Sequence, residues 1–272
     1  MLKKAYEKHL IYTYGNLRER LISIKPRKIQ YVKNFQRLPD YEEGLVFLEN
    51  KILSGLDLLP HMSRQIFDTS SKDGLLYDFG IQHLHLGLVP DLKHKNMIEG
   101  RKKVLYCIVD NDFIYFLVID DHGRWGDIEL IRLIKNNFPH LIKPFELNVN
   151  KLTSQLSEKE RVKLRKNGIN TPIEIDGKCY MSPGWGVNTI GTSSNAVFKM
   201  NIHYQHYSNV ERNIKKYFSD NEKEIINILI GINELNLSAY SISPLVLIDK
   251  KKDLIINIEL IGDQINKIGI KY

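Results

Sequence analysis

The chain has 272 residues, of which 43% are hydrophobic and 26% charged, and this composition excludes a disordered protein. Lysine and arginine outnumber aspartate and glutamate by 39 to 32, so the net charge of +7 favours a polyanionic partner such as nucleic acid. Two cysteines, Cys107 and Cys179, are too few for a cysteine zinc site, and no apolar run has the length of a secretory signal or a membrane span. We therefore expect a cytoplasmic protein with no membrane attachment.

Two helices are predicted in the first part of the chain. Residues 2–24 have apolar side chains at helical spacing, and Pro26 then breaks the pattern. Residues 41–53 form a second helical pattern, and Gly55 follows just past its end. A glycine in that place is typical of a helix C-terminus.

The clearest strand patterns lie in the central part of the chain. Residues 75–87 contain two short strand-like pieces around Gly80. Residues 104–110 and 113–120 are dense in β-branched and aromatic side chains and are joined by a tight Asp-Asn-Asp turn. Both are apolar on both faces, which is typical of central strands that are covered twice. Residues 128–137 return to helical spacing.

The last part of the chain looks like a second unit. Residues 157–160 form a capping box that opens a basic helix, and residues 172–181 indicate a hairpin turned by an Asp-Gly pair. Helical spacing resumes over about 210–232, and the chain from residue 244 alternates as a further hairpin. We therefore expect an α+β fold, with a central antiparallel sheet, flanking helices and a second α+β unit at the C-terminus.

The most unusual segment is Gln82-His83-Leu84-His85-Leu86, which reads as a strand. Alternate side chains of a strand share a face, so the two histidines point one way, about 7 Å apart, and the two leucines point toward a core. Histidine titrates near neutrality, so two imidazoles presented together could act as acid and base. The alternative is a pair of polar residues on a half-exposed strand, each bonded to backbone or water.

A metal site is a further interpretation of the same pair. It requires a third and usually a fourth ligand, which Asp120, Asp121 and His122 could supply, although the sequence does not establish their proximity. The Asp-His that completes the familiar metallo-hydrolase pattern is absent, since Leu86-Gly87 stands in its place. We expect no bound metal and no other cofactor, and keep a metal-dependent hydrolase as an alternative.

Basic residues follow the histidine strand, and five of the eleven residues 93–103 are Lys or Arg. Arg101 stands at the mouth of the next strand and is the best phosphate-binding candidate, with Lys103 close by, because its planar fork can grip two oxygens. In a meander the end of one strand lies beside the start of the next, so His122 could lie near the histidine face. One imidazole would then deprotonate a ribose 2′-hydroxyl, another would protonate the leaving 5′-oxygen, and Arg101 would stabilise the phosphorane.

Residues ~45–125 contain, in order, His-Leu-His-Leu-Gly, then Arg-Lys-Lys-Val-Leu-Tyr-Cys-Ile-Val-Asp, then a strand that ends in Asp-Asp-His-Gly. This order resembles the core of the RelE/ParE-type toxins. The resemblance implies a compact α+β fold and, for the ribonuclease members, metal-independent mRNA cleavage, with Arg101 and His122 at the matching positions. Some members of that family act on a topoisomerase instead, and the connection over 89–100 is longer here than that family needs.

Trp185 lies in a glycine-rich stretch, 182–194, that lacks the Gly-Lys-Ser/Thr of a phosphate-binding loop. It could stack on a nucleobase or merely anchor the loop. Residues 201–207 hold further aromatic and histidine side chains. In a strand they would present a stacking face, whereas in a helix His203 would pair with Tyr207.

Together these features predict a metal-independent endoribonuclease, a toxin or phage-defence effector, whose catalytic residues are His83, His85 and His122. The predicted substrate-binding residues are Arg101, Lys103 and Trp185. The expected partners are RNA or another nucleic acid and an antitoxin or regulatory protein, and the oligomeric state is left open.

The corresponding divisions of the chain are a basic N-terminal helical segment (1–40), a ribonuclease-like α+β domain (41–145) and an accessory α+β domain (146–272). A non-catalytic nucleic-acid-binding or regulatory protein is the first alternative function. The metal-dependent hydrolase with a His-x-His site is the second.

Overall fold

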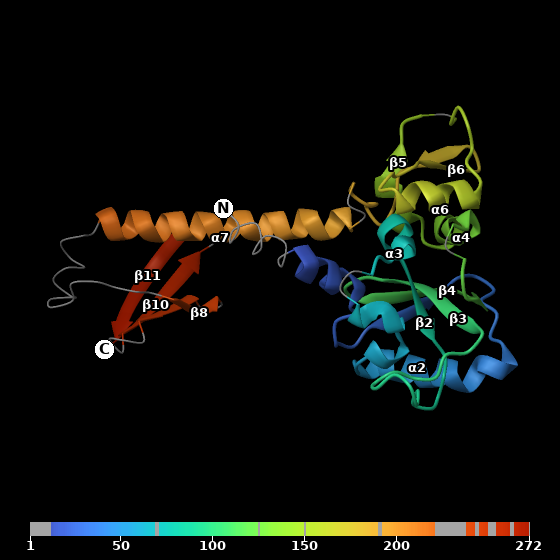
Figure 1. The fold of residues 1–272 in the computed structure, drawn as a ribbon, viewed down its shortest axis with the longest axis horizontal. Coiled ribbons are helices and arrows are strands. Elements are labelled where there is room, and N and C mark those ends of the chain that lie inside the picture. Colours follow the sequence, from blue (N-terminus) through green and yellow to red (C-terminus); the bar gives the residue numbers. More distant parts are fainter. Residues whose placement is uncertain are drawn as a thin grey trace. The chain divides into compact units, whose positions relative to one another are not determined.

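The chain forms a mixed α+β structure (Figure 1), given by a computed structural model that describes residues 12–68, 71–124, 126–149, 151–189, 192–220, 238–242, 245–249, 254–261 and 264–271. The predicted fold class is therefore confirmed. The chain groups into two compact units, residues 1–200 and residues 201–272. This grouping does not test whether the predicted segments 1–40, 41–145 and 146–272 have separate roles, so that division stays a prediction.

A four-stranded sheet in the order β1-β4-β3-β2 forms the centre of the first unit. β2 pairs antiparallel with β3, and β3 pairs antiparallel with β4, as predicted. β1 departs from the prediction, because it pairs parallel with β4 at the sheet edge and makes the sheet mixed. Its four residues are too few to show a strand pattern of their own. The strands are β1 (Lys28–Tyr31), β2 (Ile81–His85), β3 (Lys103–Val109) and β4 (Phe113–Asp121).

Apolar side chains cover both faces of this sheet, with α2 (Glu42–Ser54) on one side and α3 (Gly74–Phe79) and α4 (Ile128–Asn137) on the other (Figure 1). Successive strand residues point to opposite faces, so β3 and β4 contribute to both clusters. This explains why their sequences are apolar throughout. The α2 side buries, among others, Leu45, Leu48, Leu84, Leu86, Leu105 and Phe116, and the other side buries Leu75, Phe79, Ile81, Tyr106, Leu130 and Ile131.

Sequence periodicity predicts the helix α2 correctly and fails to predict the helix α3, which directly precedes the histidine strand. α2 is confirmed, and Gly55 ends it in the left-handed conformation at φ 68°. The strand predicted before Gly80 is wrong, because that piece is the short helix α3. Asp73 caps it by accepting a hydrogen bond from the backbone N–H of Leu76, and Gly80 ends it at φ 71°. Six residues are too few to establish a helical period, so the two end signals decide the conformation.

A three-stranded sheet in the order β5-β7-β6 and further helices complete the first unit. The capping box at Ser157 and Glu160 is confirmed at the start of α6. The hairpin between β6 and β7 is also confirmed, and Asp176 and Gly177 both have the positive φ that its tight turn requires. These elements are α5 (Pro139–Ile142), β5 (Glu146–Leu147), α6 (Glu158–Lys166), β6 (Ile173–Ile175) and β7 (Lys178–Tyr180), with short 3-10 helices η1 (Pro39–Tyr41), η2 (Leu59–His61), η3 (Arg64–Phe67) and η4 (Lys143–Phe145).

The second unit contains most of the long helix α7 (Ser194–Asp220) and an antiparallel sheet in the order β11-β10-β9-β8. The helix begins earlier than predicted and includes residues 201–207, so His203 and Tyr207 stack with ring centroids 6.4 Å apart. Residues 221–232, where the helix was expected to continue, lie outside the described residues. The C-terminal hairpin is confirmed as β9 and β10. The strands are β8 (Ser238–Ile242), β9 (Leu245–Asp249), β10 (Leu254–Ile261) and β11 (Gln264–Lys271).

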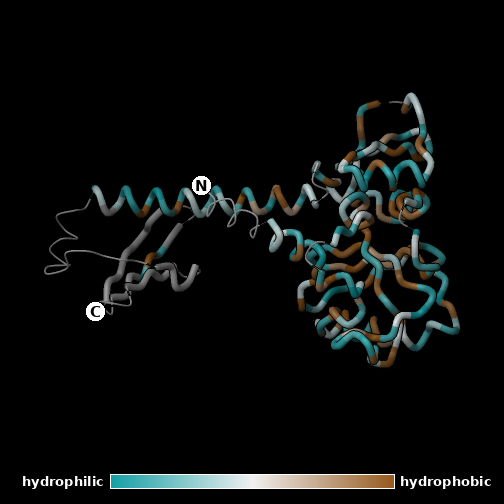
Figure 2. Tube along the Cα trace, in the orientation of Figure 1, coloured by the Kyte–Doolittle hydropathy of each residue, from teal (hydrophilic) through white to brown (hydrophobic). Residues whose placement is uncertain are grey.

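Among the described residues, no helix has both the length and the apolar character needed to cross a membrane. Figure 2 shows hydrophilic and hydrophobic residues mixed along the whole of α7.

The packing of α2 against the segment after the histidine strand makes a direct prediction. A Cβ at Gly44 would overlap the backbone carbonyl of Leu86, and neither backbone can yield without disturbing the core. We expect Gly44→Ala to lower the free energy of unfolding by about 1–3 kcal/mol in urea denaturation. Asn50→Ala, on the exposed side of the same helix, should change it by less than about 0.5 kcal/mol. Equal stability of the two variants would contradict this packing.

Candidate functional site

Three histidines converge at one end of the central sheet. His83 and His85 lie on β2, whose residue His85 pairs with Val104 at the start of β3. His122 directly follows β4, and its backbone N–H donates to the carbonyl of Lys102 at 3.2 Å, which continues the pairing of β4 with β3. The predicted meander therefore brings His122 to the histidine strand.

The three imidazole rings are in mutual contact. Ring centroids lie 4.9 Å apart for His83 and His122, 5.7 Å for His83 and His85, and 5.8 Å for His85 and His122. One ring nitrogen from each histidine lies within 4.8 Å of the others. His83 is buried, His85 half-buried and His122 exposed, so the cluster opens from the protein interior to the surface.

The environment favours neutral imidazoles. Burial, followed by the neighbouring His85 and His122, lowers the pKa of His83 to about 3. Burial and then His122 lower the pKa of His85 to about 4, and the Arg64 charge contributes to this shift. Burial also lowers the pKa of His122. At neutral pH the rings are therefore in the neutral form, which can accept a hydrogen bond or bind a metal through one nitrogen.

The His61 side chain contacts the backbone at the end of the histidine strand. Its side chain is fully buried, and its Nδ1 lies 2.9 Å from the backbone carbonyl oxygen of His85. Because a carbonyl only accepts, Nδ1 of His61 must carry the proton. No sequence pattern singles out His61, since it lies on η2 and no spacing connects it with β2.

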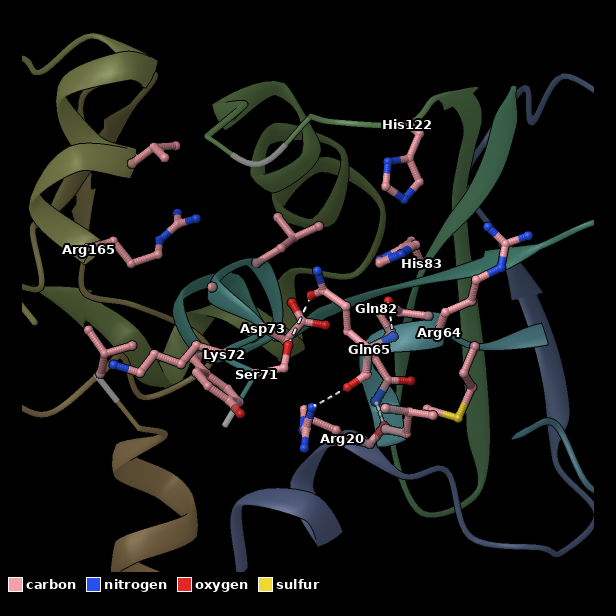
Figure 3. A pocket seen from close by; sticks show the side chains of 18 of the residues that line it. Arg20, Arg64, Gln65, Ser71, Lys72, Asp73, Gln82, His83, His122 and Arg165 are labelled. Carbon is pink, nitrogen blue, oxygen red and sulfur yellow. Dashed lines mark hydrogen bonds between the residues drawn. The ribbon is translucent and has the colours of Figure 1, made fainter. Parts of the chain in front are cut away.

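The histidines line a cavity of about 520 Å³ (Figure 3). Figure 3 shows His83, His122 and Arg64 on one side of it, and Arg165 and Lys72 on the other. The walls come from η3, α3, β2 and α6 and from the residues around them. The lining contains five cationic side chains and a single carboxylate, Asp73, and the cations are Arg20, Arg64, Lys72, Arg165 and Lys166.

Arg20 is the most deeply buried of these cations, since the residue is only 4% exposed. Its two terminal nitrogens donate to the carbonyls of Gln65 and Asp68, each at 3.0 Å. Its Nε is buried and makes no hydrogen bond within the described part of the chain. A buried donor without an acceptor costs about 1–3 kcal/mol.

Arg64 lies beside the histidines. Its guanidinium forms an ion pair with Asp91, and the side chain of that aspartate is only 9% exposed. The backbone N–H groups of Lys93 and His94 both donate to Asp91, which fixes the carboxylate. The basic loop after the histidine strand therefore orients an arginine from η3 at the cavity.

A buried ion pair holds α6 against the cavity. Arg165 donates from Nε and a terminal nitrogen to Asp78 on α3, and both side chains are almost fully buried. Ser182 donates its hydroxyl to the other oxygen of the same carboxylate. This cluster joins α6, α3 and the glycine-rich loop, and so positions Lys166 and Val162 in the cavity wall.

Asp73 combines a structural bond with a position in the cavity wall. Burial raises its pKa, while the backbone N–H groups of Leu76 and Leu75 and the charges of Arg20 and Arg165 act in the opposite direction. Because it caps α3, its carboxylate is oriented by the helix and not by the histidines.

The other predicted site residues lie elsewhere. Arg101 donates to the carbonyl of Asp40 at 2.6 Å and stacks 4.4 Å from the centroid of Tyr41, and Lys103 pairs with Asp120 and Asp121. Neither is among the residues that line the cavity.

Trp185 is 54% exposed and also lies outside the cavity lining. It stacks on Phe198 with ring planes 13° apart and meets Phe145 edge-on. These contacts anchor the loop that carries Trp185. A role for Trp185 in binding substrate stays a prediction.

No family model, no curated protein and no solved structure matches this chain. The resemblance to the RelE/ParE-type toxins therefore stays a prediction, and the function must be argued from the site itself.

The buried pair under α6 yields a stability prediction. Arg165→Met leaves the Asp78 carboxylate buried without its partner, and we expect a loss of about 3–5 kcal/mol in the free energy of unfolding. Lys199→Met removes a lysine whose side chain is 53% exposed and pairs with Glu19, and should cost no more than about 1 kcal/mol. Urea denaturation of both variants measures the difference. A loss below 1 kcal/mol for Arg165→Met would show that the pair does not hold α6.

Proposed function

We propose that His83, His85 and His122 bind one divalent metal ion and that the protein is a metal-dependent hydrolase. The observation that carries the proposal is the convergence of three imidazole nitrogens within 4.8 Å. Zinc–nitrogen bonds measure about 2.0–2.1 Å, so ligands on a tetrahedral ion lie about 3.4 Å apart. The His122 ring is exposed and so has room to turn toward the other two.

The type of ligand supports a catalytic site over a structural one. Three neutral imidazoles suit zinc, copper, iron or nickel. Three protein ligands leave a coordination position open for water, as in catalytic zinc sites, whereas structural sites are closed by a fourth ligand. The open position would face the cavity that all three histidines line.

Hydrolysis of a phosphate ester is the reaction that this site and its cations favour. A metal-bound water ionises near neutral pH. Held by the three histidines, a metal ion would supply a water activated for attack on phosphorus, with cleavage of the bond from phosphorus to the leaving oxygen. The leaving oxygen takes up one proton and the attacking water releases one. The reaction therefore consumes one water and needs no oxidant or reductant. The cationic lining stabilises the extra negative charge of the transition state.

The partners remain those predicted from the charge of the chain. A net charge of +7 supports RNA or another nucleic acid as the macromolecule that carries the phosphate ester. A role as a toxin or phage-defence effector, and an antitoxin or regulatory partner, stay predictions.

A metal-independent endoribonuclease is the second candidate function. The observation that favours it is the cationic Arg64 beside His85, since an arginine and paired imidazoles are the groups that cleavage at a ribose 2′-hydroxyl requires. The pKa values of about 3 and 4 for His83 and His85 weigh against it, because neither ring would be the protonated imidazolium, the form that acts as general acid, at neutral pH.

Metal analysis tests the leading proposal. After exposure to zinc and desalting, we expect one zinc ion per chain by elemental mass spectrometry. His83→Ala and His122→Ala should weaken zinc binding by more than the roughly 10–100-fold that loss of an outer hydrogen-bonding partner costs. His140→Ala, an exposed histidine outside the cluster, should bind zinc like the wild type. Because His122 is exposed, its variant separates ligand loss from unfolding, and full zinc retention by it would defeat the proposal.

Metal removal distinguishes the two candidate functions. Single-stranded RNA is incubated with the protein in excess chelator and after zinc is restored. The leading proposal predicts intact RNA with chelator and cleavage with zinc. Cleavage in chelator that leaves 2′,3′-cyclic phosphate ends would instead establish the metal-independent ribonuclease. Intact RNA under both conditions, with salt-dependent binding by a folded sample, would favour the non-catalytic nucleic-acid-binding alternative.

A further inference from the structure

We propose that Arg20 and Arg64 form a phosphate subsite within the histidine cavity, and that the group it receives is a single nucleotide with its phosphate. This deepens the proposed function and rests on it for the chemistry, although binding of the nucleotide itself needs no metal. Such a subsite implies that the substrate is a nucleotide or the end of a single-stranded nucleic acid.

The charge of the lining points to an anion. Within the described residues the lining holds five cationic side chains and one carboxylate, Asp73, whose pKa burial raises. Arg64 and Arg165 are paired with Asp91 and Asp78, so Arg20 and Lys166 carry the positive charge that these carboxylates do not offset. A divalent ion on the histidines would add further positive charge. A ligand that carries phosphate is the natural complement to such a cavity, because charge-assisted hydrogen bonds to phosphate oxygens are the strong ones.

Arg20 supplies the buried part of the subsite. Its residue is 4% exposed and lines the cavity, and its hydrogen bonds to Gln65 and Asp68 go to neutral carbonyl oxygens. Its Nε has a proton to donate and no acceptor within the described residues. The Nε is shielded from the cavity, so a phosphate oxygen would satisfy this donor, and balance the charge of the guanidinium, once the Arg20 side chain turns toward the cavity.

Arg64 connects the subsite with the histidines. Its charge is felt at His85, and its ion pair with Asp91 keeps it beside the cavity (Figure 3). A phosphate bound to Arg64 would therefore lie next to the imidazole cluster, in the cavity that Arg20 also lines. That arrangement would bring the phosphorus near the three histidines that would hold the metal ion.

A buried amide oxygen indicates that the ligand also carries a donor. Gln82 is 8% exposed, lines the cavity and donates to the carbonyl of Arg20 at 3.4 Å. Its Oε1 is buried and accepts no hydrogen bond within the described part of the chain. A ribose hydroxyl, a base amino group or the P–OH of a protonated phosphate would satisfy it, so the affinity for inorganic phosphate decides whether the nucleotide is needed.

The size of the cavity limits the ligand. Its volume of about 520 Å³ falls within the range of about 300–1,000 Å³ that holds small molecules and cofactors. A nucleotide fits such a space, whereas a double helix, whose major groove alone is about 12 Å wide, does not. A nucleic acid would therefore have to enter by an end or by one unstacked nucleotide.

Calorimetry with metal-free protein tests the subsite. Adenosine 5′-monophosphate is the probe, and adenosine and inorganic phosphate are the matched probes that lack one part of it. We expect the nucleotide to bind at least about tenfold more tightly than either. Equal affinity for adenosine and its monophosphate would overturn the phosphate subsite, and equal affinity for inorganic phosphate would overturn the nucleotide.

Matched variants locate the binding. Arg64→Gln and Arg20→Gln should each weaken binding of the monophosphate by about tenfold or more and leave that of adenosine unchanged. Arg37→Gln is the control, because Arg37 is also ion-paired and its side chain is 37% exposed against 42% for Arg64. Arg20 is buried, so circular dichroism must show that its variant is folded, and Arg64→Gln carries the test if it is not. Monophosphate affinity unchanged in Arg64→Gln would contradict the proposal.

The two proposals can fail separately. His122→Ala should lose zinc and still bind the monophosphate, whereas Arg64→Gln should bind zinc and lose the monophosphate. A wild-type chain that binds the nucleotide as expected and holds no zinc would remove the metal-dependent function and keep the subsite. A chain that holds zinc and shows no preference for the phosphorylated probe would remove the phosphate subsite and keep the metal-dependent function.

Discussion

The antiparallel pairing of β2, β3 and β4 is the constraint on which the rest of the site depends. In this pairing His85 lies opposite Val104, at the start of β3. The last residues of β4 pair with the same start of β3. His122 then falls into ring contact with His83. A one-residue slip of β2 would turn its histidines toward α2 and its buried leucines toward the cavity, so the apolar face of the strand fixes the orientation of the imidazoles.

The histidine face is buried by a cavity wall and not by a packed core. β2 is an edge strand, so elements beyond the sheet can approach its histidines from one side. η3 contributes Arg64 there, and α6 approaches through the buried pair of Arg165 with Asp78. The clustered neutral imidazoles and the buried Nε of Arg20 are the physical reasons for proposing a metal and an anion in it.

The sequence predicts those features that depend on local signals. α2 with Gly55, the capping box at Ser157 and the Asp176-Gly177 hairpin all follow from short-range chemistry. The approach of His122 follows from the meander rule, which is also local in the sheet. α3 was mistaken for a strand because its two end signals enclose only six residues. Arg20 and Arg64 could not be predicted, since they reach the cavity by tertiary packing from segments with no shared spacing. Arg101 was preferred for its position in the chain, but Asp40 and Tyr41 bind it.

The most direct test of the central claim is anomalous X-ray diffraction at the zinc edge, from crystals of the full chain grown with zinc. The account predicts one strong peak in each molecule, about 2.0–2.1 Å from a ring nitrogen of each of His83, His85 and His122. It also predicts a solvent oxygen at the remaining position, on the cavity side. Crystals that show zinc only on surface groups, with the three rings in contact and no peak between them, would contradict the account.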